Sequence, residues 1–156
     1  MHASKPCSEP HSMPYLVEFD AHAQIIRATV HGELSDKGAE QLYETVRTFL
    51  ATNEVRGGIL DLSPVTSWAV TLSAVRRMAK SPPLFKTPQV RVIVAEGDLI
   101  FGMARLFQIS RSEIHSELYV VHTLQEAYKI HGLESPQFVA VSATSPVDEQ
   151  AASDLS

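Results

Sequence analysis

The hydroxyl side chains between residues 61 and 73 are the first candidates for chemistry in this sequence. A phosphate on one of them would be stabilised by free backbone N–H groups and by the helix dipole, because they stand at a predicted loop and helix start. Serine and threonine are also the preferred capping and turn residues at such positions, and this structural role is favoured. Thr71 and Ser67 stay candidate phosphate acceptors. The cluster consists of Ser63, Thr66, Ser67, Thr71 and Ser73.

The sequence shows no recognisable catalytic constellation. Asp61 ends a predicted strand and could serve as a general base, but a carboxylate without a partner more often caps the loop that follows it. The seven histidines show no H-x-x-x-H or other helix-face spacing of metal ligands. The chain also lacks a G-x-S-x-G nucleophile elbow and a glycine-rich phosphate loop. We therefore expect no enzymatic activity, no metal and no cofactor.

Residues 99–109 carry the strongest indication of binding. Their apolar side chains cover more than one face of a helix, whereas a surface helix needs an apolar stripe only about 100° wide. Either the helix is central and packs on both sheet and helices, or it borders a groove for an apolar ligand or a protein partner. Phe101 and Met103 are expected at the mouth of such a groove. Arg105, the lone cation of this segment, is expected to reach water, a carboxylate such as Glu96 or Asp98, or an anionic ligand head group.

Strand-like and helix-like periods alternate along the chain and place these residues. Two short runs at 15–19 and 25–31 predict an antiparallel hairpin. The order ββαβαβαβα then predicts an α/β domain with a mixed sheet of about five strands. We expect helices mainly on one face, because the first two strands are half-polar. The later strands are predicted at 59–62, 90–95 and 118–121, and the helices at 39–50, 72–79, 99–109 and 123–131.

Two local signals bound the last helix. Thr123-Leu124-Gln125-Glu126 has the T-x-x-E form of a capping box at its start. Gly132 stands where a C-terminal cap favours positive φ.

Length and composition predict one globular domain with two tails. The 156 residues, 44% of them hydrophobic, suit a single core. The polar segments 1–14 and 134–156 predict a flexible N-terminal tail and a mostly disordered C-terminal tail around a domain at 15–133. Within the second tail, Phe138–Val141 is strand-like and either docks on the core or stays free.

Charge and cysteine content limit the classes of binding partner and the cellular compartments that we expect for this protein. A net charge of -5 argues against nucleic acid, whose binding surfaces are basic. The single cysteine, Cys7, excludes an intramolecular disulfide and gives no sign of an oxidising compartment. No apolar stretch reaches the roughly 18 residues of a membrane span, and no signal-peptide core precedes the domain. We expect a cytosolic protein.

The element order, with VRVIVAEGDLIFGMARLFQ at 90–108 and VHTLQEAY at 121–128, resembles the STAS-like superfamily, in particular the SpoIIAA-like group. The resemblance covers about residues 15–133 and is most specific at Gly102-x-x-Arg105. Members of the wider family include antagonists of anti-sigma factors, which are switched by phosphorylation of a serine where the third strand meets the second helix. Their Asp-Ser-Ser-Gly element would fall near residues 69–72 here, where the acid and the glycine are absent and Thr71 is the only hydroxyl.

The resemblance implies a regulatory binding module that engages a protein partner or a second copy of itself. Its alternative is a small carrier or sensor of a lipid-like anionic ligand, held in a cleft beneath residues 99–109, because some relatives are compared with Sec14-type lipid-binding domains. An enzyme that uses Asp61 or a histidine is the weakest alternative. The surface assigned to the partner or ligand comprises Trp68, Asp98, Phe101, Met103 and Arg105.

Overall fold

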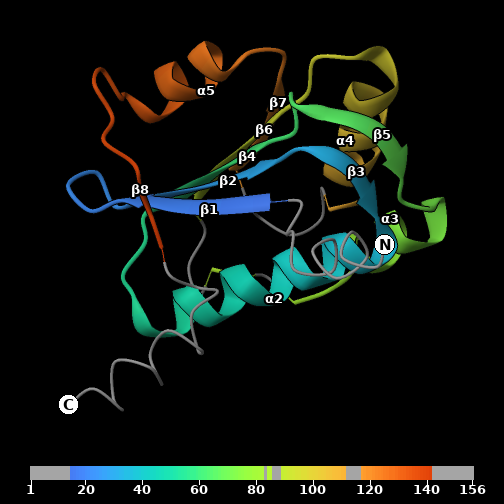
Figure 1. Ribbon diagram of the computed structural model, residues 1–156, viewed down its shortest axis with the longest axis horizontal. Helices are drawn as coiled ribbons and strands as arrows, with labels where there is room; N and C mark the ends of the chain where they lie inside the picture. Colours follow the sequence, from blue (N-terminus) through green and yellow to red (C-terminus); the bar gives the residue numbers. More distant parts are fainter. Residues whose placement is uncertain (1–14, 83, 86–88, 112–116, 142–156) are drawn as a thin grey trace, which may run out of the picture.

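A mixed β-sheet with helices on both faces organises the chain in the computed structural model (Figure 1). The structure describes residues 15–82, 84–85, 89–111 and 117–141. Its elements are β1 (Tyr15–Asp20), β2 (Ile25–Val30), β3 (Gly32–Ser35), α2 (Asp36–Thr52), β4 (Gly57–Asp61), β5 (Val65–Ala69), α3 (Leu72–Ala79), β6 (Val90–Val94), α4 (Asp98–Ser110), β7 (Glu117–Val121), α5 (Leu124–His131) and β8 (Val139–Ala140).

The six strands of the main sheet lie in the order β7-β6-β4-β2-β1-β8. β1 and β2 form the antiparallel hairpin that the sequence predicts, with Tyr15 opposite Val30 and Asp20 opposite Ile25. β2, β4, β6 and β7 are parallel neighbours. A hairpin continued by parallel strands confirms the predicted mixed α/β sheet.

The sixth strand comes from a segment that was predicted as part of a mostly disordered tail. β8 pairs antiparallel with β1, and Val141 N donates a hydrogen bond to the carbonyl oxygen of Val17 at 2.9 Å. The carboxylate of Asp20 also accepts a hydrogen bond from Gln137 N at 2.8 Å. The strand-like run 138–141 thus docks on the sheet, which therefore has six strands rather than about five. The rest of that tail, 142–156, and the N-terminal tail, 1–14, with Cys7, lie outside the described residues.

A small parallel sheet of β3 and β5 is absent from the predicted order ββαβαβαβα. In β5 only Val65 and Trp68 are large and apolar, while Thr66 and Ser67 are exposed. In β3 only Leu34 is buried. Such short, half-polar strands carry too few apolar residues to show a period in the sequence.

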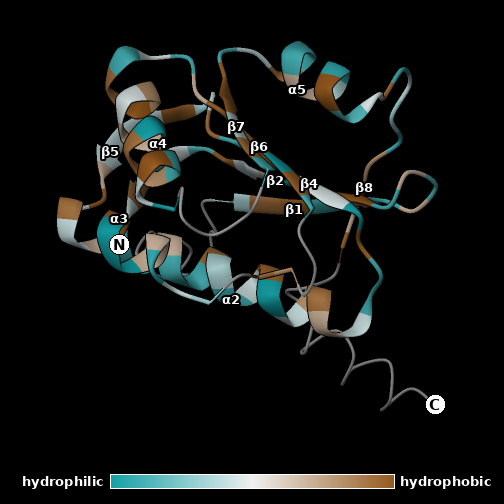
Figure 2. Ribbon diagram, turned by 180° about the vertical axis from the view of Figure 1, so that it is seen from behind, coloured by the Kyte–Doolittle hydropathy of each residue, from teal (hydrophilic) through white to brown (hydrophobic). Residues whose placement is uncertain are grey.

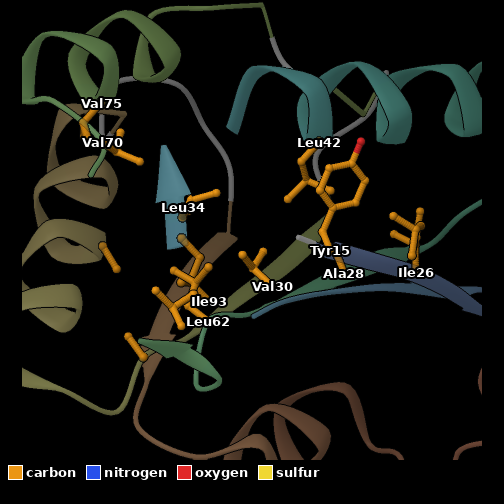
Figure 3. Close-up of a cluster of buried hydrophobic side chains, with 14 of the residues drawn as sticks. Tyr15, Ile26, Ala28, Val30, Leu34, Leu42, Leu62, Val70, Val75 and Ile93 are labelled. Carbon is orange, nitrogen blue, oxygen red and sulfur yellow. The ribbon is translucent and has the colours of Figure 1, made fainter. Parts of the chain in front are cut away.

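Helices cover both faces of the main sheet. α2, α3 and α4 pack on one face, over a core that includes Ile26, Ala28 and Ile93 (Figure 3). α5 packs on the other face, where Ala127 joins Val92 in a second buried cluster. The expectation of helices mainly on one face therefore holds for three of the four described helices. Most of β6 is hydrophobic (Figure 2), and its Ile93 lies in the first core cluster while Val92 and Val94 lie in the second, so the second face also needs a cover.

The boundaries of α5 agree with the local signals in the sequence. Thr123 Oγ1 accepts a hydrogen bond from Glu126 N at 3.2 Å, and Glu126 Oε1 accepts one from Thr123 N at 3.0 Å. Gly132 ends the helix with φ of 70°. The structure thus confirms both the capping box and the glycine cap.

Candidate functional site

A cavity of about 220 Å³ lies between the main sheet and helices α2, α3 and α4. Leu42 reaches from α2 toward Ala28 of β2 in this layer (Figure 3), and Met103 and Phe107 of α4 form another wall. Nearly all of the lining is apolar. Such a lining offers water few hydrogen-bond partners, so it suits apolar molecules better than polar ones.

Small residues from the sheet and from the helices that cover it border this space. Ala28 lies on β2, Gly58 on β4, Ala39 on α2 and Ala104 on α4, and all four line the cavity. None of them extends a side chain beyond Cβ, whereas core positions are usually filled by Leu, Ile, Val or Phe to native packing density. Four small residues that are far apart in the sequence therefore leave this volume unfilled.

Two arginines border the otherwise apolar cavity. Arg111 caps the C-terminal end of α4 and is only 3% exposed. Its Nη1 donates hydrogen bonds to the carbonyl oxygens of Met78 at 3.2 Å, Ala79 at 2.9 Å and Ser81 at 3.4 Å. These carbonyls belong to the end of α3, where a positive charge is favourable. Within the described parts of the chain, Arg111 Nε and Nη2 have no hydrogen-bond partner.

The second arginine, Arg91, lies on β6 and lines the same cavity. Burial lowers the pKa of Arg91, and the positive charge of Arg111 lowers it further, while Tyr43 acts in the opposite direction. Burial likewise lowers the pKa of Arg111. Both guanidinium groups stay charged, because arginine does not deprotonate in proteins. No described Asp or Glu forms an ion pair with either one.

The residues predicted as a partner or ligand surface separate into two groups. Met103 and Trp68 line the cavity, and the indole Nε1 of Trp68 is buried without a partner among the described residues. Phe101 lies against His122 instead, with ring centroids 4.1 Å apart and nearly parallel planes.

The two charged members of that predicted surface are both exposed on α4. Arg105 Nη1 donates to Gln108 Oε1 at 2.9 Å, so the cation expected at a ligand head group does not line the cavity. Asp98 stands in the first turn of α4, where its negative charge complements the helix dipole.

Thr71 is a helix cap with a second, long-range contact. Its Oγ1 accepts a hydrogen bond from Ala74 N at 3.1 Å and donates one to Asp36 Oδ2 at 3.0 Å. Thr71 N donates to the other carboxylate oxygen, Oδ1, at 2.8 Å. A phosphate on this hydroxyl would meet the Asp36 carboxylate, which disfavours phosphorylation in this conformation. Ser67, the other candidate acceptor, is exposed on β5.

The contacts of Asp61 are those of a loop cap. Asp61 Oδ1 accepts hydrogen bonds from both the backbone N and the Oγ of Ser63, which is the loop-capping role. Among the described His, Cys, Asp and Glu residues, no group of three gathers as a metal site would require. None of the helices in the described ranges is long and apolar enough to span a membrane.

The sequence prediction missed the two arginines, although each carries a signal. Arg91 interrupts the apolar strand VRVIV at a position that alternation places on the same face as Ile93. Arg111 follows Met103 and Phe107 at steps of four residues, so the three share one side of α4. The lone cation considered for this helix was Arg105, because the predicted helix ended at Ile109.

No protein-family model matches this chain, and no curated protein matches it. The function must therefore be inferred from the cavity and its arginines.

Proposed function

We propose that this protein is a non-enzymatic carrier or sensor that holds an apolar ligand in the cavity beneath α4. The single observation that carries this proposal is the cavity of about 220 Å³ with an apolar lining. Ligand pockets in proteins are typically concave, mostly apolar and largely formed before binding. The cavity has this character, and the lining residues with polar side-chain groups are Tyr43, Trp68, Arg91 and Arg111.

The energetic argument follows from the apolar lining of the cavity. A ligand that fills the space recovers dispersion contacts that the protein alone forgoes. Binding of an apolar group is therefore favourable, and it stabilises the fold.

The proposal also fits the resemblance to the STAS-like superfamily. The α/β fold with a mixed sheet that begins in a hairpin is compatible with that assignment. The comparison of some relatives with Sec14-type domains supports a ligand under the apolar helix. We retain the STAS-like, SpoIIAA-like assignment as part of this proposal.

A second candidate, a regulatory module that engages a protein partner, is favoured by the outer surface of α4. Leu99 is 63% exposed and Ile109 is 60% exposed. Exposed apolar side chains of this size are typical of interaction surfaces when they are contiguous. Light scattering on the purified protein and on Leu99→Glu tests self-association: a dimer that dissociates in the variant supports this candidate, and a monomer in both proteins argues against it.

Calorimetric titration with octan-1-ol, a neutral alkyl probe, tests the carrier proposal. Wild-type protein should bind the probe, and Ala104→Leu should bind it at least about tenfold more weakly, because the added side chain occupies the cavity. Ala51→Leu is the matched control, since Ala51 is exposed on α2 and remote from the lining. Absence of binding to the wild type, or equal binding to Ala104→Leu, would overturn the proposal.

A further inference from the structure

We propose that Arg91 and Arg111 bind the carboxylate of an alkyl carboxylate whose chain occupies the cavity. This inference rests on the proposed function and adds the chemical class of the ligand. It starts from two cationic side chains that border the cavity, where the lining contains no described Asp or Glu. A buried positive charge without a counter-ion is unfavourable, and an anionic group at this place would compensate it.

Two donor nitrogens of Arg111 lack a hydrogen-bond partner among the described residues, and they lie on the same edge of its guanidinium group. Nη1 is occupied by the carbonyl oxygens at the end of α3, and the nearest of these, on Ala79, lies at 2.9 Å. Nε and Nη2 are buried and have no partner among the described residues. These two nitrogens form one edge of the planar guanidinium, and their N–H bonds point in the same direction. Such an edge accepts the two oxygens of a carboxylate in parallel hydrogen bonds.

Arg91 supplies a second positive charge from a different element. In the sheet it stands opposite Gly58 of β4 and Leu118 of β7, and all three residues line the cavity. Burial is the main cause that lowers the pKa of Arg91, and the like charge of Arg111 lowers it further. An anion near both guanidinium groups turns this mutual repulsion into two attractions. The pair therefore favours an anionic over a neutral ligand end.

The path of the alkyl chain follows from α4. Met103, Phe107 and Arg111 succeed one another by one helical turn and all line the cavity. The Phe107 ring centroid lies 5.6 Å from Arg111 Cζ. Eight residues of helix span about 12 Å. A carboxylate at Arg111 thus places a medium-length chain along Phe107 and Met103.

Paired titrations of octanoate and octan-1-ol test this assignment, because the two probes share the chain and differ in the charge. Wild type should bind octanoate about tenfold or more tightly than octan-1-ol, as expected for charge-assisted hydrogen bonds. Arg111→Lys keeps the charge but loses the two-donor edge, and Arg91→Gln loses the charge on β6. Both variants should lose most of the preference for octanoate and keep their affinity for octan-1-ol. Arg105→Gln is the control, because Arg105 is exposed and does not line the cavity.

Each remaining outcome is decisive. If wild type binds octan-1-ol as tightly as octanoate, the carboxylate assignment is wrong, while the apolar cavity of the proposed function stands. If neither probe binds, the proposed function fails. If acetate or inorganic phosphate binds as tightly as octanoate, the two arginines form a site for small anions. This result would overturn the assignment of an alkyl carboxylate as the ligand. Thermal unfolding of Arg111→Lys shows whether it folds; if it does not, Arg91→Gln decides alone, and an unchanged octanoate preference there refutes the inference.

Discussion

A substitution that fills the cavity should stabilise the ligand-free protein. Enlarging a core residue usually has the opposite effect and destabilises the fold. Ala104→Leu adds three carbon atoms to a side chain that is 4% exposed and lines the cavity. At about 0.8 kcal/mol per buried carbon the gain is roughly 2.4 kcal/mol. Ordering the leucine side chain costs about 0.5–1 kcal/mol. The net stabilisation is therefore about 1–2 kcal/mol, or roughly 2–8 °C in Tm for a chain of this size.

The matched control is Ala74→Leu on α3. Ala74 is 1% exposed but does not line the cavity. The same substitution there forces a large side chain into filled space, and overpacking of this kind costs typically 1–3 kcal/mol. The two variants should thus change stability in opposite directions.

Urea denaturation of both variants, after removal of bound ligand by unfolding and refolding, gives the two free energies of unfolding. The slope with denaturant should stay at the wild-type value, which shows that the unfolded states are comparable. If Ala104→Leu is destabilised as much as Ala74→Leu, the space beneath α4 is already filled by the protein itself, and the reasoning fails.

Two further predictions concern the cap of α3 and a half-buried histidine. Thr71→Ala removes the N-cap and the Oγ1 contact with Asp36, so urea denaturation should show a loss of about 1 kcal/mol; Thr71→Ser should restore most of it, and equal losses in both would contradict the capping role. His131 Nε2 lies 3.0 Å from the carbonyl oxygen of Gly58, and burial lowers its pKa in the folded protein, while this hydrogen bond opposes the shift. The unfolded chain then binds a proton more readily, so the free energy of unfolding should be highest above about pH 6.5 and decrease as the pH falls below it. His131→Gln should flatten that dependence in denaturation curves at pH 7.5 and 5.5, and an unchanged slope would show that another group causes it.

Features that depend on residues close in the chain were predictable. The hairpin of β1 and β2 follows from alternating residues on either side of a short loop. The capping box from Thr123 to Glu126 spans four residues, and the glycine cap at Gly132 is a single backbone position. Each signal is complete within one helical turn or one strand, so no tertiary contact is needed to recognise it.

Features built from weak or distant signals were not predictable. β3 and β5 are short and contain too few apolar residues to show a period in the sequence. Only their pairing in the structure identifies them as strands. The docking of β8 depends on the pairing with β1 and on the bond from Gln137 N to Asp20, which join residues more than 100 positions apart. The polar composition of residues 134–156 was the reason that this segment was predicted to be a tail.

The sequence by itself determined the α/β alternation, the hairpin and the helix caps, because backbone propensities and apolar periods act over a few residues. Only the tertiary structure decided where the proposed ligand site lies. Ala28, Gly58 and Ala104 are ordinary small residues until the fold brings them around one unfilled volume. Arg91 and Arg111 are 20 positions apart on a strand and a helix end, and they become a pair because both face the same cavity. A cavity and its uncompensated charge are properties of packing, and packing is set by contacts between distant residues.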